Sequence, residues 1–168
     1  MINVTSLEHT DSLAPYAQEL LDGLIPILER LDITQLSSKS YIAVENQKGG
    51  FVLRLEIIPG TEEIPLLDLW AGPDQCILGY ADSEQIEAHG IPFDWKTLVS
   101  HVIVETERYL NGVTVIENYN RNRKLIKKAY FYGVDTENNR DSIIGSSQYL
   151  TFPRKVESVV KRTHRFLK

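Results

Sequence analysis

Apolar residues recur at helical spacing in three stretches of the chain. The first covers residues 12–36, the second begins after the N-cap candidate Asp94 and stops at Asn111, and the third covers residues 154–167. Apolar positions three or four residues apart are typical of helices that bury one side. Pro26 removes a backbone donor inside the first stretch, so we expect a kink or two short helices there.

Between the first two helical stretches, apolar and polar residues alternate as in strands. The expected strands are residues 41–45, 51–58, 64–70 and 76–80. Successive strand residues point to opposite faces of a sheet. The apolar set in the second strand is therefore expected to face the helices, with Arg54 and Glu56 pointing away; that set is Phe51, Leu53, Leu55 and Ile57. The connections are short, which favours antiparallel pairing.

A second hairpin is expected after the second helix, from residues 113–119 and 124–132. Residues 82–92 and 133–147 are polar and are expected to connect elements, and residues 148–151 are a candidate short strand. The sequence therefore predicts a single α+β domain over residues 1–168. Its sheet is mainly antiparallel and twisted, with four strands plus a second hairpin, and three helical segments pack on one face.

This order of elements resembles that of secretion chaperones, which place three helices around a twisted antiparallel sheet. Small immunity proteins that neutralise toxins are similar in size and acidity. Both resemblances concern topology and composition, and no motif accompanies them. No residue role is therefore carried over from either class of protein.

Composition indicates an ordinary globular core, with 42% hydrophobic and 24% charged residues. Cys76 is the single cysteine, and the first residues lack the pattern of a signal peptide. We therefore expect a reducing, cytoplasmic location. No run of about 18 apolar residues occurs, so no membrane span is expected.

The net charge of −5 conceals an asymmetry between the two parts of the chain. Residues 1–93 hold fifteen acids and four bases, whereas residues 94–168 hold eight acids and fourteen bases. Such asymmetry can mark an interaction surface. It can equally reflect two parts that attract each other within one fold.

The short motifs of phosphate, dinucleotide, zinc and nucleophile sites are absent from the sequence. His101 and Glu105 lie four residues apart on the second helix, which suits a metal pair, but a solvated polar face explains them more simply. Cys76 has apolar neighbours and is expected to be a buried thiol. We assign no catalytic residue and expect no metal or cofactor.

Strand alternation predicts one exposed sheet face that combines acids with large aromatic residues. Its members are Tyr41, Glu45, Arg54, Glu56, Asp68 and Trp70. Aromatic residues among acids on an open sheet are suited to a basic protein partner. The alternative for Trp70 is that the chain's own loop or final helix covers it.

A secondary candidate patch lies in the second hairpin, which contains both basic and aromatic residues. It comprises Arg121, Arg123, Lys127 and Tyr130. Such a mixture can bind a protein or nucleic acid, or be a solvated hairpin. The acidity of the chain and the lack of an RNA-recognition signature disfavour nucleic acid.

The sequence therefore favours a non-enzymatic protein-binding module, of the inhibitor or immunity type or a chaperone-like adaptor. The expected partner is another protein, and a basic toxin or effector is one candidate; a homodimer also stays open. The alternative is a small enzyme of the hydrolase or nuclease type. Its dispersed carboxylate and histidine site would be built around Asp68, Glu56 or His101.

Overall fold

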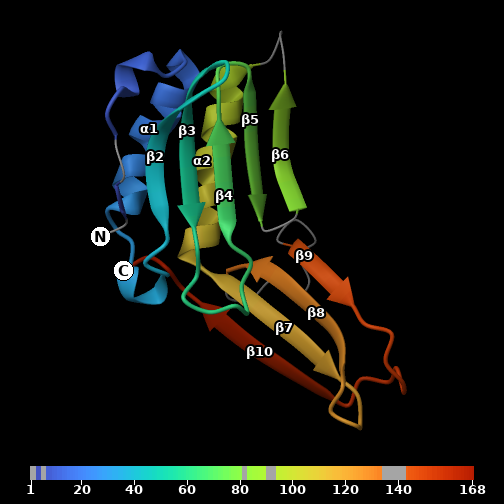
Figure 1. The fold of residues 1–168 in the computed structure, drawn as a ribbon. Helices are drawn as coiled ribbons and strands as arrows, with labels where there is room; N and C mark the ends of the chain where they lie inside the picture. Colours follow the sequence, from blue (N-terminus) through green and yellow to red (C-terminus); the bar gives the residue numbers. More distant parts are fainter. Residues whose placement is uncertain (1–2, 5–6, 81–82, 90–93, 134–142) are drawn as a thin grey trace. The chain divides into compact units, whose positions relative to one another are not determined.

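The computed structural model describes residues 3–4, 7–80, 83–89, 94–133 and 143–168 (Figure 1). It confirms the α+β class, with two α-helices and two sheets in the described residues. The chain divides into two compact units, where the sequence predicted one domain. The first unit comprises residues 1–107 and 166–168, and the second comprises residues 108–165.

The sheet of the first unit has six strands in chain order among the described residues. They are β1 (Asn3–Val4), β2 (Tyr41–Gln47), β3 (Gly50–Ile57), β4 (Leu67–Ala71), β5 (Gln75–Tyr80) and β6 (Ser83–His89). β1 pairs with β2 in parallel, and the other pairs are antiparallel. The four expected strands are thus confirmed as β2 to β5.

The expectation of a polar connection over residues 82–92 is wrong for residues 83–89, because β6 lies there and pairs with β5; residues 82 and 90–92 are outside the described residues. A strand at the edge of a sheet is held by backbone hydrogen bonds to one neighbour. It therefore needs no alternation of apolar residues, and its sequence carries little strand signal.

Helices α1 (Pro15–Leu28) and α2 (Trp95–Asn111) lie against one face of this sheet (Figure 1). The helix-facing side of β3 is confirmed for Leu53, Leu55 and Ile57, whose side chains are fully buried. Phe51 was also expected in the core but is only half-buried, with its ring 5.4 Å from that of His9. The buried helix residues Leu20, Leu24, Val99 and Val102 complete this core.

The helical stretch expected over residues 12–36 is shorter in the structure, because α1 ends at Leu28 and a separate 3-10 turn follows at Ile33–Gln35. The helix does not divide at Pro26, which lies inside the last turn of α1. A glycine inside the helix allows a close approach of α2. A Cβ atom at Gly23 would lie 2.3 Å from Cδ1 of Ile103.

The start of α2 is also as expected, because Asp94 caps it. The Asp94 carboxylate accepts hydrogen bonds from the backbone N–H and the hydroxyl of Thr97. These bonds hold the pKa of Asp94 below its usual range, with the side-chain bond from Thr97 as the largest cause. The helix ends at Asn111, before Gly112, at the predicted position.

The second unit contains a four-stranded antiparallel sheet in the order β10-β7-β8-β9. Its strands are β7 (Val113–Tyr119), β8 (Leu125–Tyr132), β9 (Ile143–Gln148) and β10 (Ser158–His164). The expected second hairpin is confirmed as β7 and β8. The strand expected at residues 148–151 lies earlier, as β9, inside part of the expected polar loop; residues 134–142 of that loop are outside the described residues.

The expected third helix over residues 154–167 is wrong, because this segment contains β10, which pairs with β7 from Ser158 to His164. Val156, Val159, Val160 and Thr163 have helical spacing, but they are β-branched and prefer extended backbone. Pairing with β7 stabilises the extended conformation of this segment. The resemblance to secretion chaperones depended on three helices and loses that support.

Candidate functional site

The face of β2 to β4 opposite the helices carries the six residues predicted from strand alternation. We call it the outer sheet face; it comprises Tyr41, Glu45, Arg54, Glu56, Asp68 and Trp70. Each of the six is half-buried rather than fully exposed. Tyr41 lies opposite Glu56, which lies opposite Asp68, and Arg54 lies opposite Trp70. The structure thus brings these five together on three adjacent strands.

Glu45 lies beside this group, opposite Val52 of β3. Val52 points to the outer sheet face, yet it is only 1% exposed. The side chain of Gln47 donates a hydrogen bond of 3.0 Å to the Glu45 carboxylate. The outer sheet face therefore has a partly apolar base beside Glu45.

Charge on the outer sheet face is predominantly negative, with three acids and one base. Arg54 donates a hydrogen bond of 2.9 Å to the Asp68 carboxylate through one terminal nitrogen. Its Nε atom is buried and has no acceptor within the part of the chain that the structure describes. Glu56 stands opposite Asp68, so a cationic side chain placed near both carboxylates would relieve their repulsion.

The position of the Trp70 ring depends on Gly72, two residues later in the chain. A Cβ atom at Gly72 would lie 2.3 Å from Cη2, 2.8 Å from Cζ3 and 2.9 Å from Cζ2 of Trp70. The indole ring therefore lies directly over the Gly72 backbone. Only glycine leaves room for the ring in this position.

The turn beneath Trp70 is fixed from the helix side by Tyr16 of α1. The Tyr16 hydroxyl lies 2.5 Å from the carbonyl oxygen of Gly72 and 2.6 Å from that of Gln75. Its ring stacks on Trp95 of α2, with centroids 4.1 Å apart. Burial, followed by the charges of Cys76 and Asp74, raises the pKa of Tyr16 well above its usual value. The hydroxyl thus stays protonated and tethers the β4–β5 turn.

The residues of the alternative enzyme site are not brought together. His101 is exposed on α2, which covers the inner face of the sheet, whereas Glu56 and Asp68 belong to the outer sheet face. Cys76 is fully buried, and burial raises the pKa of its thiol to about 12. Within the described ranges, no group of three or more His, Cys, Asp or Glu side chains could hold a metal ion.

The secondary candidate patch does not form one surface. Arg121 and Arg123 are exposed in the turn between β7 and β8. Lys127 lies opposite Asn118 and Tyr130 opposite Val115, which places their side chains on opposite faces of β8. A flat partner can therefore contact Lys127 or Tyr130 together with the turn arginines, but it cannot contact all four residues at once.

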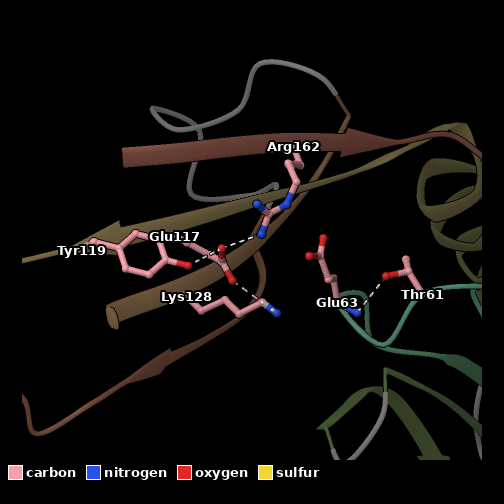
Figure 2. A network of polar contacts seen from close by, with 6 residues as sticks. All are labelled: Thr61, Glu63, Glu117, Tyr119, Lys128 and Arg162. Atoms are coloured by element: carbon pink, nitrogen blue, oxygen red, sulfur yellow. Dashed lines mark hydrogen bonds and ion pairs between the residues drawn. The ribbon is translucent and has the colours of Figure 1, made fainter. Parts of the chain in front are cut away.

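A polar network that sequence reasoning missed centres on Glu117 of β7 (Figure 2). Its carboxylate accepts hydrogen bonds from Arg162 at 2.5 Å and from the Tyr119 hydroxyl at 2.9 Å, and Lys128 lies 3.7 Å away. Burial raises the pKa of Glu117, but these hydrogen bonds and charges outweigh burial and hold it below the usual value. Arg162 belongs to β10, so the wrongly expected helix concealed this contact.

The difference in net charge between the two units is larger than that between residues 1–93 and residues 94–168. The first unit holds eighteen acids and six bases, whereas the second holds five acids and twelve bases. The outer sheet face therefore belongs to a strongly acidic unit, and the β7–β8 turn to a basic one.

In the part of the chain that the structure describes, no helix has the length and apolar character needed to cross a membrane. Comparison of the chain with protein-family models, with curated proteins and with solved structures finds no match. The chemistry of the surfaces themselves therefore carries the functional argument.

Proposed function

We propose that this protein is a non-enzymatic binding module, of the inhibitor or immunity type or a chaperone-like adaptor, that captures a basic protein. The outer sheet face is the binding surface. The observation that carries the proposal is the position of the Trp70 ring over Gly72, on a sheet face that also carries Glu56 and Asp68. A half-buried aromatic side chain on a sheet face with three acids and one base is a suitable centre for a protein interface.

The fixed position of Trp70 supports this use. Binding usually costs free energy because side chains at the interface lose freedom. The Trp70 ring lies on backbone that Tyr16 holds, so little freedom remains to be lost. Apolar contact with the ring supplies affinity, and the three acids supply a preference for a basic partner.

The charge of the whole first unit supports the same partner class. Its excess of acids attracts a basic protein over a distance of about 8–10 Å at physiological salt, and this attraction speeds association. A cytoplasmic location is part of the proposal. The free, buried thiol of Cys76 suits a reducing compartment.

The experiment is a capture assay from extracts of the source cell. The bait is compared with a double variant, Trp70→Ala with Asp68→Ala. A matched control, Ile33→Ala with Glu29→Ala, removes one exposed apolar side chain and one exposed acid from the same unit, in the 3-10 turn and at the end of α1. Circular dichroism and thermal unfolding verify that all three proteins are folded.

We expect the unmodified protein and the control to capture the same basic protein. The affinity of the double variant for this protein should fall by a factor of about ten or more. Loss of a central aromatic residue commonly costs about 2 kcal/mol or more of binding free energy. Equal affinity of the double variant would overturn the outer sheet face as the binding surface. Turnover of a small substrate without any captured protein would instead favour the enzyme.

A further inference from the structure

Two connections lie side by side at one end of the sheet in the second unit. Asn120 Nδ2 donates a hydrogen bond of 3.0 Å to the carbonyl of Pro153, and the backbone N–H of Glu157 donates one of 2.9 Å to the carbonyl of Tyr119. The hydroxyl of Thr151 donates a bond of 3.0 Å to the carbonyl of Leu125. We call this surface the tip and define it as residues 120–124 and 149–157.

The tip has a fixed internal structure. Asn120 is 2% exposed, and its side-chain oxygen accepts hydrogen bonds of 3.0 Å from the backbone N–H groups of Asn122 and Lys124. One buried amide thus shapes the β7–β8 turn and ties it to the β9–β10 connection. Side chains on the tip are therefore presented by backbone that is held in place.

Exposed apolar side chains concentrate on and beside the tip. Leu150 is 85% exposed and Phe152 is 71% exposed. The described part of the chain has eight exposed large hydrophobic residues, and five of them fall within residues 149–159. Besides Leu150 and Phe152, these are Tyr149, Val156 and Val159. Scattered exposed apolar residues are ordinary, but a cluster of this kind marks an interaction surface.

Basic side chains belong to the tip as well. Five exposed bases belong to the tip: Arg121, Arg123, Lys124, Arg154 and Lys155. The guanidinium of Arg154 lies over the Phe152 ring, 5.5 Å from its centroid. The acid Glu157 lies 3.8 Å from Lys155, and the pair is exposed, so the tip keeps a clear excess of positive charge.

We propose that the tip docks on an anionic lipid bilayer. Leu150 and Phe152 enter the interfacial region, while the arginines and lysines of the tip contact lipid phosphate and carboxylate groups. Exposed apolar side chains together with exposed bases match the two layers of such a surface, and docking of this kind needs no membrane span. The proposal rests on the second unit and is independent of the outer sheet face.

The exposed side chains favour lipid over other anionic partners. Single-stranded nucleic acid binds by stacking bases on aromatic rings. Leu150, the most exposed of the cluster, offers no ring, and Arg154 already lies over one side of Phe152. A protein partner would need a pocket shaped for Leu150, whereas a bilayer accepts it without one.

The experiment measures flotation of the full chain with two kinds of vesicle. One kind contains phosphatidylcholine alone, and the other contains equal parts of phosphatidylcholine and phosphatidylserine. The apolar variant is Leu150→Ala with Phe152→Ala, and the charge variant is Arg121→Gln with Arg123→Gln. The control, Ile33→Ala with Val104→Ala, removes two exposed apolar side chains from the first unit. All changed residues are exposed, so the fold is expected to survive.

We expect binding to the phosphatidylserine vesicles only, with both tip variants weakened about tenfold or more and the control unchanged. No excess binding over phosphatidylcholine vesicles would overturn the proposal. Equal binding by the apolar variant would also overturn it, because the tip would then act by charge alone. A labelled single-stranded oligonucleotide or polyglutamate that binds where vesicles do not would assign the tip to nucleic acid or acidic protein instead.

Discussion

At the scale of single residues, the outer sheet face depends on the absence of a side chain at position 72. The Trp70 ring occupies the volume that a Cβ atom would need, with 2.3 Å as the shortest separation. An indole ring is rigid and cannot yield as the end of a flexible chain can. The ring must therefore move if residue 72 gains a methyl group.

We predict that Gly72→Ala displaces Trp70 and lowers the free energy of unfolding by about 1–3 kcal/mol, because the site becomes overpacked. Fluorescence of Trp70, read in a Trp95→Phe background, should shift toward that of a more exposed indole. The matched control is Gly72→Ala in a Trp70→Ala background, where the cost should largely disappear. An equal cost in both backgrounds would show that the ring is not the cause.

A substitution at Leu55 tests which face of β3 is buried against the helices. Its side chain is 0% exposed, so Leu55→Ala should lower the free energy of unfolding by about 2–5 kcal/mol through lost burial and a cavity. Chemical denaturation measures this loss. Glu56→Ala, on the opposite face of the same strand, is the control and should change stability by less than about 1 kcal/mol. Similar effects of the two substitutions would contradict the assigned faces.

Glu117 gives the second unit a dependence on pH whose sign follows from its lowered pKa. A carboxyl whose pKa is lower in the folded chain stabilises the fold above its unfolded pKa. This contribution is lost as the pH falls through the folded pKa.

We predict that Glu117→Gln lowers the free energy of unfolding at neutral pH by about 1–3 kcal/mol, because Arg162 and Lys128 lose their anionic partner. The difference from the unmodified protein should shrink below about pH 4. Urea unfolding at the two pH values measures it. Glu157→Gln, at an exposed ion pair, serves as the control and should have little effect at either pH.

At the scale of elements, alternation and periodicity predicted the parts of the fold that bury one face. Leu53, Leu55 and Ile57 are buried as β3 predicts, and Asp94 begins α2 as its capping chemistry predicts. β6 was missed because edge pairing leaves little trace in side chains. β10 was mistaken for a helix because Val156, Val159, Val160 and Thr163 have helical spacing. Their β-branched side chains also suit a strand, and only pairing with β7 decides between the two structures.

The contact between α1 and the β4–β5 turn can be tested at the same scale. Tyr16→Phe removes the hydroxyl shared by the carbonyls of Gly72 and Gln75, and should cost about 1–3 kcal/mol because these acceptors lose a buried donor. Thermal or urea unfolding measures the loss, and hydrogen exchange should quicken at the turn. Tyr41→Phe, on the outer sheet face, is the control. An equal loss for both would show that Tyr16 does not tether the turn.

At the scale of the whole molecule, charge rather than a catalytic cluster distinguishes the two units. The composition of the outer sheet face could be predicted, because it follows from alternation in strands that the sequence identifies. Its packing could not, because the seating of Trp70 depends on Gly72 and on Tyr16 from another element. The tip and the Glu117 network could not be predicted either, since both require β10 to be recognised as a strand.

The central claim is that Trp70 stands at the centre of an interface with a basic protein. The most direct measurement replaces Trp70 with the photoreactive residue benzoylphenylalanine, irradiates the living source cell and identifies the products by mass spectrometry. We predict a covalent product with one basic protein, absent without irradiation and absent when the same residue replaces Ile33. A product from position 33 but none from position 70, with the variant folded and expressed, would contradict the account.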